Sequence, residues 1–192
     1  TGQTGGKADA DIDAPEAWDI TIGNPDILVG VIDSGIDYMH PDLAENIWTN
    51  PNEIPDNGID DDQNGYVDDV YGYDWFSMDN DPFDDYSHGT HVAGIVGAVG
   101  QNNIGISGLA WNVKIVALRF IGSCGIGSTS GAISALQYAN DMGVKITNNS
   151  WSSGSYSKGL AEELDRSDSL GHLFITSAGN HAHDIDIIET YP

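Results

Sequence analysis

The stretch ILVGVIDSG at residues 27–35 decides the fold. Its first six residues form a continuous apolar run, and Asp33, Ser34 and Gly35 follow as turn residues. A short apolar run that ends in a turn is typical of a strand buried on both faces of a parallel sheet. Three similar runs follow at residues 113–118, 144–150 and 173–178.

Helical patterns lie between these runs. Residues at i, i+3, i+4 and i+7 are apolar in one segment, namely Val92, Ile95, Val96 and Val99. A second segment repeats apolar residues at similar spacing, with Gly143 as its expected end, namely Ile133, Leu136, Ala139 and Met142. A weaker pattern predicts a third helix over about 158–170. Strands alternating with helices predict an α/β fold with a mainly parallel, buried sheet and helices on both faces.

Length and charge narrow the classes of function. The 192 residues suit one domain, and we expect an N-terminal arm at 1–14 followed by a domain at 15–192. A net charge of −24 disfavours nucleic acid and anionic membranes as partners, and it suits a protein that binds cations or works in salt. No segment resembles a signal peptide or a membrane span. The single cysteine, Cys124, forms no internal disulfide, and we expect it to be a small loop residue.

Residues 53–85 form an acidic excursion that carries twelve of the thirty acidic residues. Asp60, Asp62 and Asn64 alternate before Gly65, as in the opening of an EF-hand loop. The twelfth position is Tyr71 rather than Glu, which disfavours a true EF-hand. We therefore predict a calcium-stabilised loop of another geometry, with Asp68 or Asp69 completing the ligands. A solvated acidic loop is the alternative.

Three polar residues are placed to meet at the carboxyl edge of the predicted sheet. Asp33 ends the first strand, Asn180 follows the last, and His88 begins a helix. Ligands of open α/β sheets bind at this edge. A carboxylate, an imidazole and an amide together are the parts of an acyl-transfer site. The alternative is that Asp33 and Asn180 are ordinary turn and loop residues.

Three longer motifs add a family resemblance. VGVIDSGIDYMHPDL (29–43), SHGTHVAGIVGA (87–98) and ITSAGN (175–180) closely resemble the subtilisin-like serine proteases, in that family's order. The resemblance covers about residues 15–180 and implies that Asp33 is the triad acid, His88 the general base and Asn180 the oxyanion donor. We expect Gly89, next to the base, to permit close approach of substrate.

The resemblance also implies sites for substrate and metal. Two segments correspond to the walls that bind a peptide by strand pairing, and their residues are Gly125, Ile126, Gly127, Ser150, Trp151 and Ser152. The alternative for both segments is ordinary loop structure. A second calcium site would use Asp42, Asn102 and the carbonyls of Ile104 and Ile106, although this loop is one residue longer than the family pattern.

The nucleophile of the family has no counterpart in these residues. Ser34, Ser130 and Ser177 stand in the wrong context, so we expect a serine endopeptidase whose 192-residue chain alone is inactive. A C-terminal fragment would supply the serine, and polypeptide substrates and a pro-segment are the expected partners. Family habit, the charge and calcium predict a secreted, extracellular protein. The alternative is a non-catalytic calcium-stabilised scaffold or binding module.

A zinc site is the alternative interpretation of the two histidines in HGTH at residues 88–91. Their spacing is i, i+3 rather than that of H-E-x-x-H, and only HAHD at 181–184 could add a ligand. We therefore expect His91 to be a packed, hydrogen-bonded structural residue, and His40 to be the same.

Overall fold

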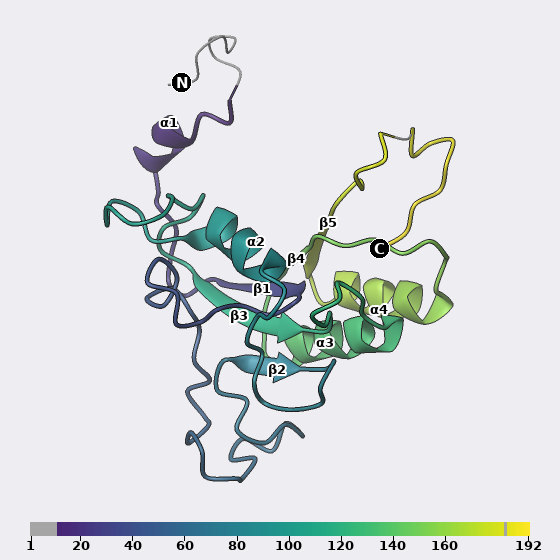
Figure 1. Cartoon of the computed structure of the whole chain (residues 1–192), viewed down its shortest axis with the longest axis horizontal. Coiled ribbons are helices and arrows are strands. Elements are labelled where there is room, and N and C mark those ends of the chain that lie inside the picture. Colours follow the sequence, from purple (N-terminus) through teal and green to yellow (C-terminus); the bar gives the residue numbers. More distant parts are fainter. Residues whose placement is uncertain (1–10, 183) are drawn as a thin grey trace.

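A five-stranded parallel sheet organises the molecule, which a computed structural model describes over residues 11–182 and 184–192 (Figure 1). The spatial order is β2-β3-β1-β4-β5. The strands are β1 (Leu28–Asp33), β2 (Gly72–Asp74), β3 (Lys114–Arg119), β4 (Ile146–Asn149) and β5 (Leu173–Thr176). The predicted parallel sheet is confirmed, and four of its strands come from the four apolar runs. Most of the predicted arm at 1–14 lies outside the described residues.

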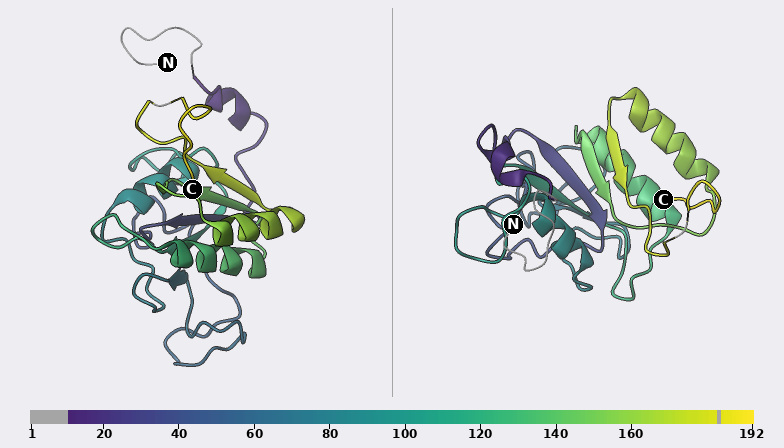
Figure 2. Two further views of the ribbon diagram at one scale, coloured as in Figure 1. Left: turned by 90° about the vertical axis from the view of Figure 1, so that its right-hand side faces the viewer. Right: turned by 90° about the horizontal axis from the view of Figure 1, so that it is seen from above.

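Helices cover both faces of the sheet, as the sequence predicts (Figures 1 and 2). Helix α2 (His88–Gly97) packs on the face that carries Val31 and Ile115. Helices α3 (Thr129–Asp141) and α4 (Lys158–Ser169) lie together on the opposite face, where α3 packs against Ile32 and Leu118. Because β1 is central, its residues alternate between these two cores.

The parallel register aligns three charged residues at one edge of the sheet. Asp33 at the end of β1 pairs with Arg119 at the end of β3. Arg119 in turn pairs with Asp74 at the end of β2. The ends of three strands thus place Asp33, Arg119 and Asp74 side by side, at the edge of the sheet where the sequence predicts a site.

The apolar stripe predicted for α2 is only part of the face that the helix buries, since Val92 and Val96 pack against the core but Ile95 does not. Ile95 is 54% exposed, whereas the small residues Ala93, Gly94 and Gly97 are buried. The helix lies so close to the sheet that a Cβ on Gly97 would sit 3.1 Å from the Cδ1 of Ile115. Small residues permit this approach, so the spacing of large apolar residues predicts the helix but only part of its buried face.

Three further details differ from the expectation. Strand β5 is not buried, because it is an edge strand in the described sheet and Leu173 is 58% exposed. Strand β2 lies inside the excursion expected to be irregular, and its three residues carry no apolar run that could signal a strand. A short helix, α1 (Ala14–Trp18), precedes β1, and the indole of Trp18 packs 4.5 Å from that of Trp111.

Two crossovers of the sheet have opposite hands. The connection β2-α2-β3 and the connection β3-α3-β4 advance in the same direction across the sheet. Their helices nevertheless lie on opposite faces. One of the two must therefore be left-handed, against a preference for right-handed crossovers of about 98%. Since β4-α4-β5 shares its direction and face with β3-α3-β4, the exception is β2-α2-β3, the unit that carries His88.

The acidic excursion is attached to the domain rather than detached from it. The Tyr138 hydroxyl of α3 donates to Oδ2 of Asp69 over 2.5 Å. Burial raises the pKa of Asp69, although hydrogen bonds from Tyr138, Asn64 and Asn50 oppose this.

Among the described residues, no helix is both long enough and apolar enough to cross a membrane.

Candidate active site

Asp33 and His88 form a hydrogen-bonded pair at the carboxyl edge of the sheet. Asp33 is the last residue of β1 and is fully buried, whereas the His88 side chain, at the start of α2, is 44% exposed. The Nδ1 of His88 lies 2.7 Å from Oδ1 of Asp33. The structure thus brings together two of the three residues predicted for the acyl-transfer site.

The contacts of Asp33 define the tautomer of His88. Oδ1 of Asp33 also accepts a hydrogen bond from the backbone N–H of Ser34 at 2.7 Å. An ionised carboxylate can only accept, so when Asp33 is ionised Nδ1 of His88 carries the proton and Nε2 is left free to accept one. Burial raises the pKa of Asp33, and the hydrogen bonds from His88 and Ser34 oppose that rise.

The start of α2 is held from outside the helix. Ser87, at the N-cap position, has a left-handed backbone with φ of 74° and makes no side-chain cap. Instead the N–H of Gly89 donates to Oγ of Ser34, and the N–H of Thr90 donates to Oδ2 of Asp84, each at 2.9 Å. These two bonds satisfy amide groups that a helix start leaves free.

Gly89 faces the sheet rather than the substrate, which corrects the expected reason for its presence. A Cβ at this position would lie 2.1 Å from the carbonyl oxygen of Gly35 and 3.2 Å from the Cβ of Asp33. Gly89 is therefore needed because the start of α2 approaches the turn after β1 so closely.

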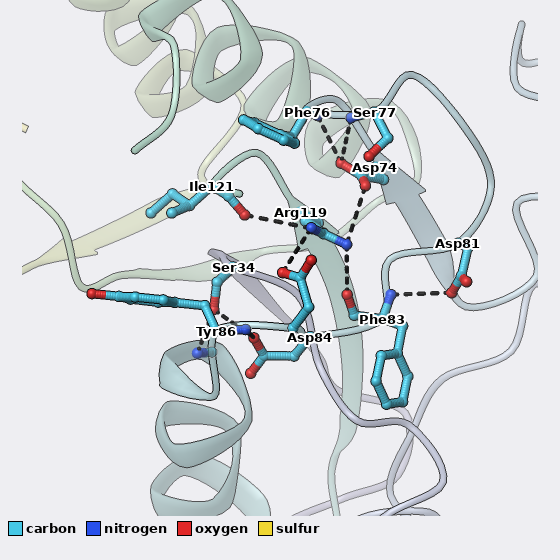
Figure 3. Close-up of polar contacts among 12 residues, drawn as sticks. Ser34, Asp74, Phe76, Ser77, Asp81, Phe83, Asp84, Tyr86, Arg119 and Ile121 are labelled. Carbon is cyan, nitrogen blue, oxygen red and sulfur yellow. Dashed lines mark hydrogen bonds and ion pairs between the residues drawn. The ribbon is translucent and has the colours of Figure 1, made fainter. Parts of the chain in front are cut away.

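Arg119 holds the segment that leads into α2, as Figure 3 shows. Its guanidinium donates to the Phe83 carbonyl at 2.8 Å and to Oδ1 of Asp85 at 2.9 Å. Oδ2 of Asp74 lies 3.4 Å from Nη1. Arg119 is only 7% exposed and Asp74 is buried, so their contact is made out of water, whereas the Asp85 carboxylate is 47% exposed.

Asn180 lies beyond the end of β5 and is exposed. It is on the same edge of the sheet as Asp33, because all five strands are parallel. Its role as an oxyanion donor stays a prediction.

A hollow brings both predicted substrate segments together. Gly125 and Gly127 line one side and Trp151 and Ser152 the other. Trp151 is anchored, because its Nε1 donates to the Ile32 carbonyl at 2.9 Å. The predicted segments Gly125–Ile126–Gly127 and Ser150–Trp151–Ser152 therefore face a shared space, although Ile126 and Ser150 do not line it.

Part of the backbone of the first segment is already paired within the chain. The Gly122 N–H donates to the Ile126 carbonyl at 3.0 Å, and Gly127 pairs with Ile121 in an antiparallel bridge. On the opposite side the Ser153 N–H donates to the Tyr191 carbonyl at 2.7 Å. Cys124, next to the first segment, is an exposed free thiol.

The acidic excursion contains a group of carboxylates that could hold a metal. Among the described residues, that group consists of Glu53, Asp60 and Asp62, whose nearest oxygens lie within 4.8 Å of one another. Glu53 was missed by the sequence reasoning, because it lies outside the alternating acidic pattern. The other predicted ligands, Asn64, Asp68 and Asp69, are placed nearby.

Those neighbours make hydrogen bonds that stabilise the loop. Asp68 accepts from the N–H groups of Asn57 and Gly58 at 3.1 and 2.9 Å. Asn64 donates from its amide to Asp62 and to Asp69. The excursion is thus a network of carboxylates and amides, and its oxygen donors are those that calcium prefers.

The residues of the second predicted calcium site converge. Asp42 is 2% exposed and accepts hydrogen bonds from the Asn102 amide at 2.7 Å and from the Ile106 N–H at 2.9 Å. The Asn102 oxygen accepts from the Ile104 N–H. A buried carboxylate is a ligand that calcium prefers, although the two partners seen here are N–H groups rather than the predicted oxygens of Asn102 and Ile106.

The other histidines do not form a zinc site in the described part of the chain. The one potential metal-binding group found there contains no histidine. His91 is exposed, which corrects the expectation that it is packed, because the helix turns this residue away from the sheet. His40 is partly buried and its Nδ1 accepts from the Asp42 N–H at 3.1 Å. His183 lies outside the described residues.

The fold and the Asp–His pair define an α/β protein with an acid–base dyad of the kind that serves a nucleophile. The model of the subtilase family matches residues 24–191. The chain therefore belongs to the subtilase family. This confirms the family resemblance inferred from the three motifs.

Named relatives agree with the family. The chain is 43% identical over 155 residues to subtilisin-like protease 1 of Plasmodium vivax, covering 80% of this chain and 25% of the relative. It is 30% identical to thermitase of Thermoactinomyces vulgaris, covering 88% and 52%. A crystal structure of a cold adapted subtilisin-like serine proteinase matches with a TM-score of 0.62 at 28% identity, covering 81% of this chain and 47% of that one. The chain thus spans about a quarter to a half of these relatives.

Proposed function

We propose that this chain provides the acid and the base of a serine endopeptidase that hydrolyses peptide bonds through an acyl-enzyme. The observation that carries the proposal is the 2.7 Å bond between Nδ1 of His88 and Oδ1 of Asp33, which leaves Nε2 free to accept a proton. Family membership supports the same chemistry. His88 takes the proton of a serine hydroxyl as that oxygen attacks the substrate carbonyl, and later gives it to the leaving amine.

The remaining groups have supporting roles in this scheme. Asp33 fixes the tautomer of His88 and stabilises the imidazolium that forms. Asn180 donates to the oxyanion of the tetrahedral intermediate. The polypeptide substrate lies between the segments at 125–127 and 150–152, where main-chain pairing gives affinity without a strong demand for sequence.

The nucleophile in this proposal is a serine outside residues 1–192, on the continuing chain or on a separate fragment. Ser34, the serine next to the catalytic acid, is buried and donates to Asp84, so it is not available to attack a substrate. The 192-residue chain alone is therefore expected to be inactive. Secretion is part of the same proposal, supported by the acidic surface and the calcium-type loops.

Calcium is proposed at the two loops described above. Glu53, Asp60 and Asp62 would hold one ion, with Asn64, Asp68 and Asp69 around it. Asp42, Asn102 and carbonyls of the 104–106 segment would hold the other. The ion would neutralise carboxylates that otherwise repel one another, and so would stabilise the loops rather than take part in the reaction.

A peptidase assay on the full-length protein tests the proposed activity. Hydrolysis of an unstructured protein should be blocked by a fluorophosphonate and lost in His88→Ala, while a His91→Ala variant, altered on the same helix at an exposed position, should stay active. A fluorophosphonate-unreactive, inactive wild-type protein would contradict the proposal and favour a calcium-stabilised binding module.

A further inference from the structure

The catalytic acid and the start of α2 are joined by a second connection, besides the bond between Asp33 and His88. Ser34 follows Asp33, and its N–H donates to the Asp33 carboxylate. Its Oγ accepts from the Gly89 N–H at 2.9 Å. The residue after the acid thus binds the residue after the base, and both bonds are buried.

Asp84 completes this connection. The Ser34 hydroxyl donates to Oδ1 of Asp84 at 2.9 Å (Figure 3). Its oxygen is then free to accept from the Gly89 N–H at the start of α2. Oδ1 also accepts from the N–H groups of Tyr86 and Ser87. Oδ2 accepts from both the N–H and the hydroxyl of Thr90, at 2.9 and 2.6 Å.

The carboxylate of Asp84 therefore accepts five hydrogen bonds while it is 7% exposed. Four of its donors belong to residues 86–90, which form the approach to α2 and its first turn. A carboxylate at the positive end of a helix is further favoured by the helix dipole. An asparagine at position 84 would offer one acceptor oxygen in place of two. Its N–H₂ group would face either the two donors of Thr90 or the three donors of Ser34, Tyr86 and Ser87.

We propose that Asp84 is a positioning residue for the general base: through Ser34 and Thr90 it fixes the start of α2 against the end of β1, and so fixes His88 on Asp33. This inference rests on the proposed role of His88 as the base. Within the described part of the chain Asp84 makes no hydrogen bond to Asp33 or His88, so its effect is on geometry. Small displacements of a catalytic group are costly, because the reaction needs close alignment of the reacting atoms.

The adjacent residue offers a matched control. Asp85 carries the same charge in the same segment, but its carboxylate binds Arg119 instead of α2. Asp84→Asn and Asp85→Asn remove the same charge near His88. A difference between them therefore reports the hydrogen bonds to α2 rather than the loss of a negative charge.

Kinetics of the full-length protein provide the first test. Asp84→Asn should lower kcat about 10- to 100-fold, as expected for a displaced catalytic group, and leave KM within about 2-fold. Asp85→Asn should leave kcat within about 3-fold, because surface charges act weakly through water. Ser34→Ala should resemble Asp84→Asn, and Ser34→Thr, which keeps the hydroxyl, should restore most of the rate.

Proton NMR of the same proteins provides a readout that does not need activity. The Nδ1 proton of His88, held by Asp33, should give a downfield signal in the wild type and in Asp85→Asn. In Asp84→Asn that signal should weaken or shift through faster exchange with water. Retention of both the wild-type signal and the wild-type kcat in a folded Asp84→Asn variant would overturn the inference.

The two proposals fail in different ways. A wild-type protein without peptidase activity would contradict the proposed function, while the NMR comparison would still decide whether Asp84 positions His88. If Asp84→Asn does not fold, the Ser34→Ala and Ser34→Thr pair decides, since both keep the Asp84 charge. Equal signals and equal rates in that pair would reject the positioning role.

Discussion

Two buried carboxylates near His88 have pKa values that are shifted in opposite directions. Burial raises the pKa of Asp33, and its Oδ2 has no hydrogen-bond partner among the described residues. Burial also acts to raise the pKa of Asp84, but hydrogen bonds from Thr90, Tyr86 and Ser34 outweigh it and lower the pKa. Folding therefore disfavours the charge of Asp33 and favours the charge of Asp84, and such perturbed groups are common at functional sites.

Asp84 should make the stability of the protein depend on pH. Because its folded pKa lies below the unfolded value of 3.8, its ionised form is favoured by folding. Its contribution is complete above pH 3.8 and is lost as the pH falls through the lower folded value. We expect the wild type to be about 2 kcal/mol more stable than Asp84→Asn at pH 6, since charged hydrogen bonds contribute that much.

Thermal melts of both proteins between pH 6 and pH 2 measure this effect. The difference in Tm should stay constant down to about pH 4 and then shrink. A difference that grows on acidification would show that the sign of the pKa shift is wrong.

Gly89 should tolerate no side chain. An added Cβ would lie 2.1 Å from the Gly35 carbonyl oxygen, so Gly89→Ala must push α2 away from β1. We expect a loss of about 1–3 kcal/mol from this overpacking, together with a fall in kcat. Urea denaturation measures the first and the peptidase assay the second.

Gly94→Ala is the matched control on the same helix. There a Cβ would meet Cδ1 of Ile106 at 3.6 Å, an ordinary contact, so the higher helix propensity of Ala should stabilise by up to about 1 kcal/mol. Equal effects at the two positions would mean that the close approach at Gly89 does not constrain the site.

At the scale of elements, Arg119 connects strands to the loop that precedes α2. It ends β3, lies beside the ends of β1 and β2, and reaches residues 83 and 85. Its guanidinium also lies 5.9 Å from the centre of the Phe76 ring. The planar fork of arginine suits several acceptors at once, which a lysine cannot match.

Arg119→Ala should therefore destabilise strongly. The change leaves Asp74 buried without its cation, and breaking a buried ion pair costs about 3–5 kcal/mol. Lys158→Ala removes an exposed pair with Glu162 and should cost less than about 1 kcal/mol. Urea denaturation of both variants checks the contrast, and a similar small loss in each would argue that water reaches the Arg119 site.

The sequence predicts those elements whose signal is local. Four apolar runs and three helical patterns locate four strands and three helices, because fully buried strands and amphipathic helices leave a mark in consecutive residues. Strand β2 leaves no such mark, since pairing with β3 creates it. Only part of the buried face of α2 is predicted, because its close contact with the sheet selects glycine and alanine, which the periodicity of large residues does not detect.

The residues of the site likewise fall into those that the sequence predicts and those that it does not. Asp33 and His88 stand in long motifs, and the structure pairs them as the resemblance implies. Asp84 and Arg119 were missed, because an aspartate within an acidic run looks solvated and an arginine ending a strand looks like any edge residue. Only the assembled fold shows that both are buried and engaged.

At the scale of the whole molecule, the charge of −24 has to be accommodated. Self-repulsion destabilises a compact state that carries so many like charges. The acidic excursion contributes to this repulsion, because carboxylate oxygens of Glu53, Asp60 and Asp62 lie within 4.8 Å of one another. A bound cation would turn this repulsion into stabilisation.

Chelation should therefore lower the melting temperature. At free calcium 100 times the dissociation constant, one site contributes about 2.7 kcal/mol, which EDTA removes and added calcium restores. Asp62→Asn and Asp42→Asn should each abolish part of the calcium response, whereas the exposed Asp26→Asn should keep all of it. A melt that thorough chelation leaves unchanged would contradict both sites.

The left-handed β2-α2-β3 unit has a consequence for how the chain reaches its native state. The intrinsic twist of strands favours the right-handed connection, which would place α2 on the face occupied by α3. In such a topological isomer the sheet could form, yet His88 would be separated from Asp33 by the sheet itself. Productive folding must therefore discriminate between two mirror-related routings of one helix, and refolding from denaturant is expected to be slow wherever the more common routing forms first.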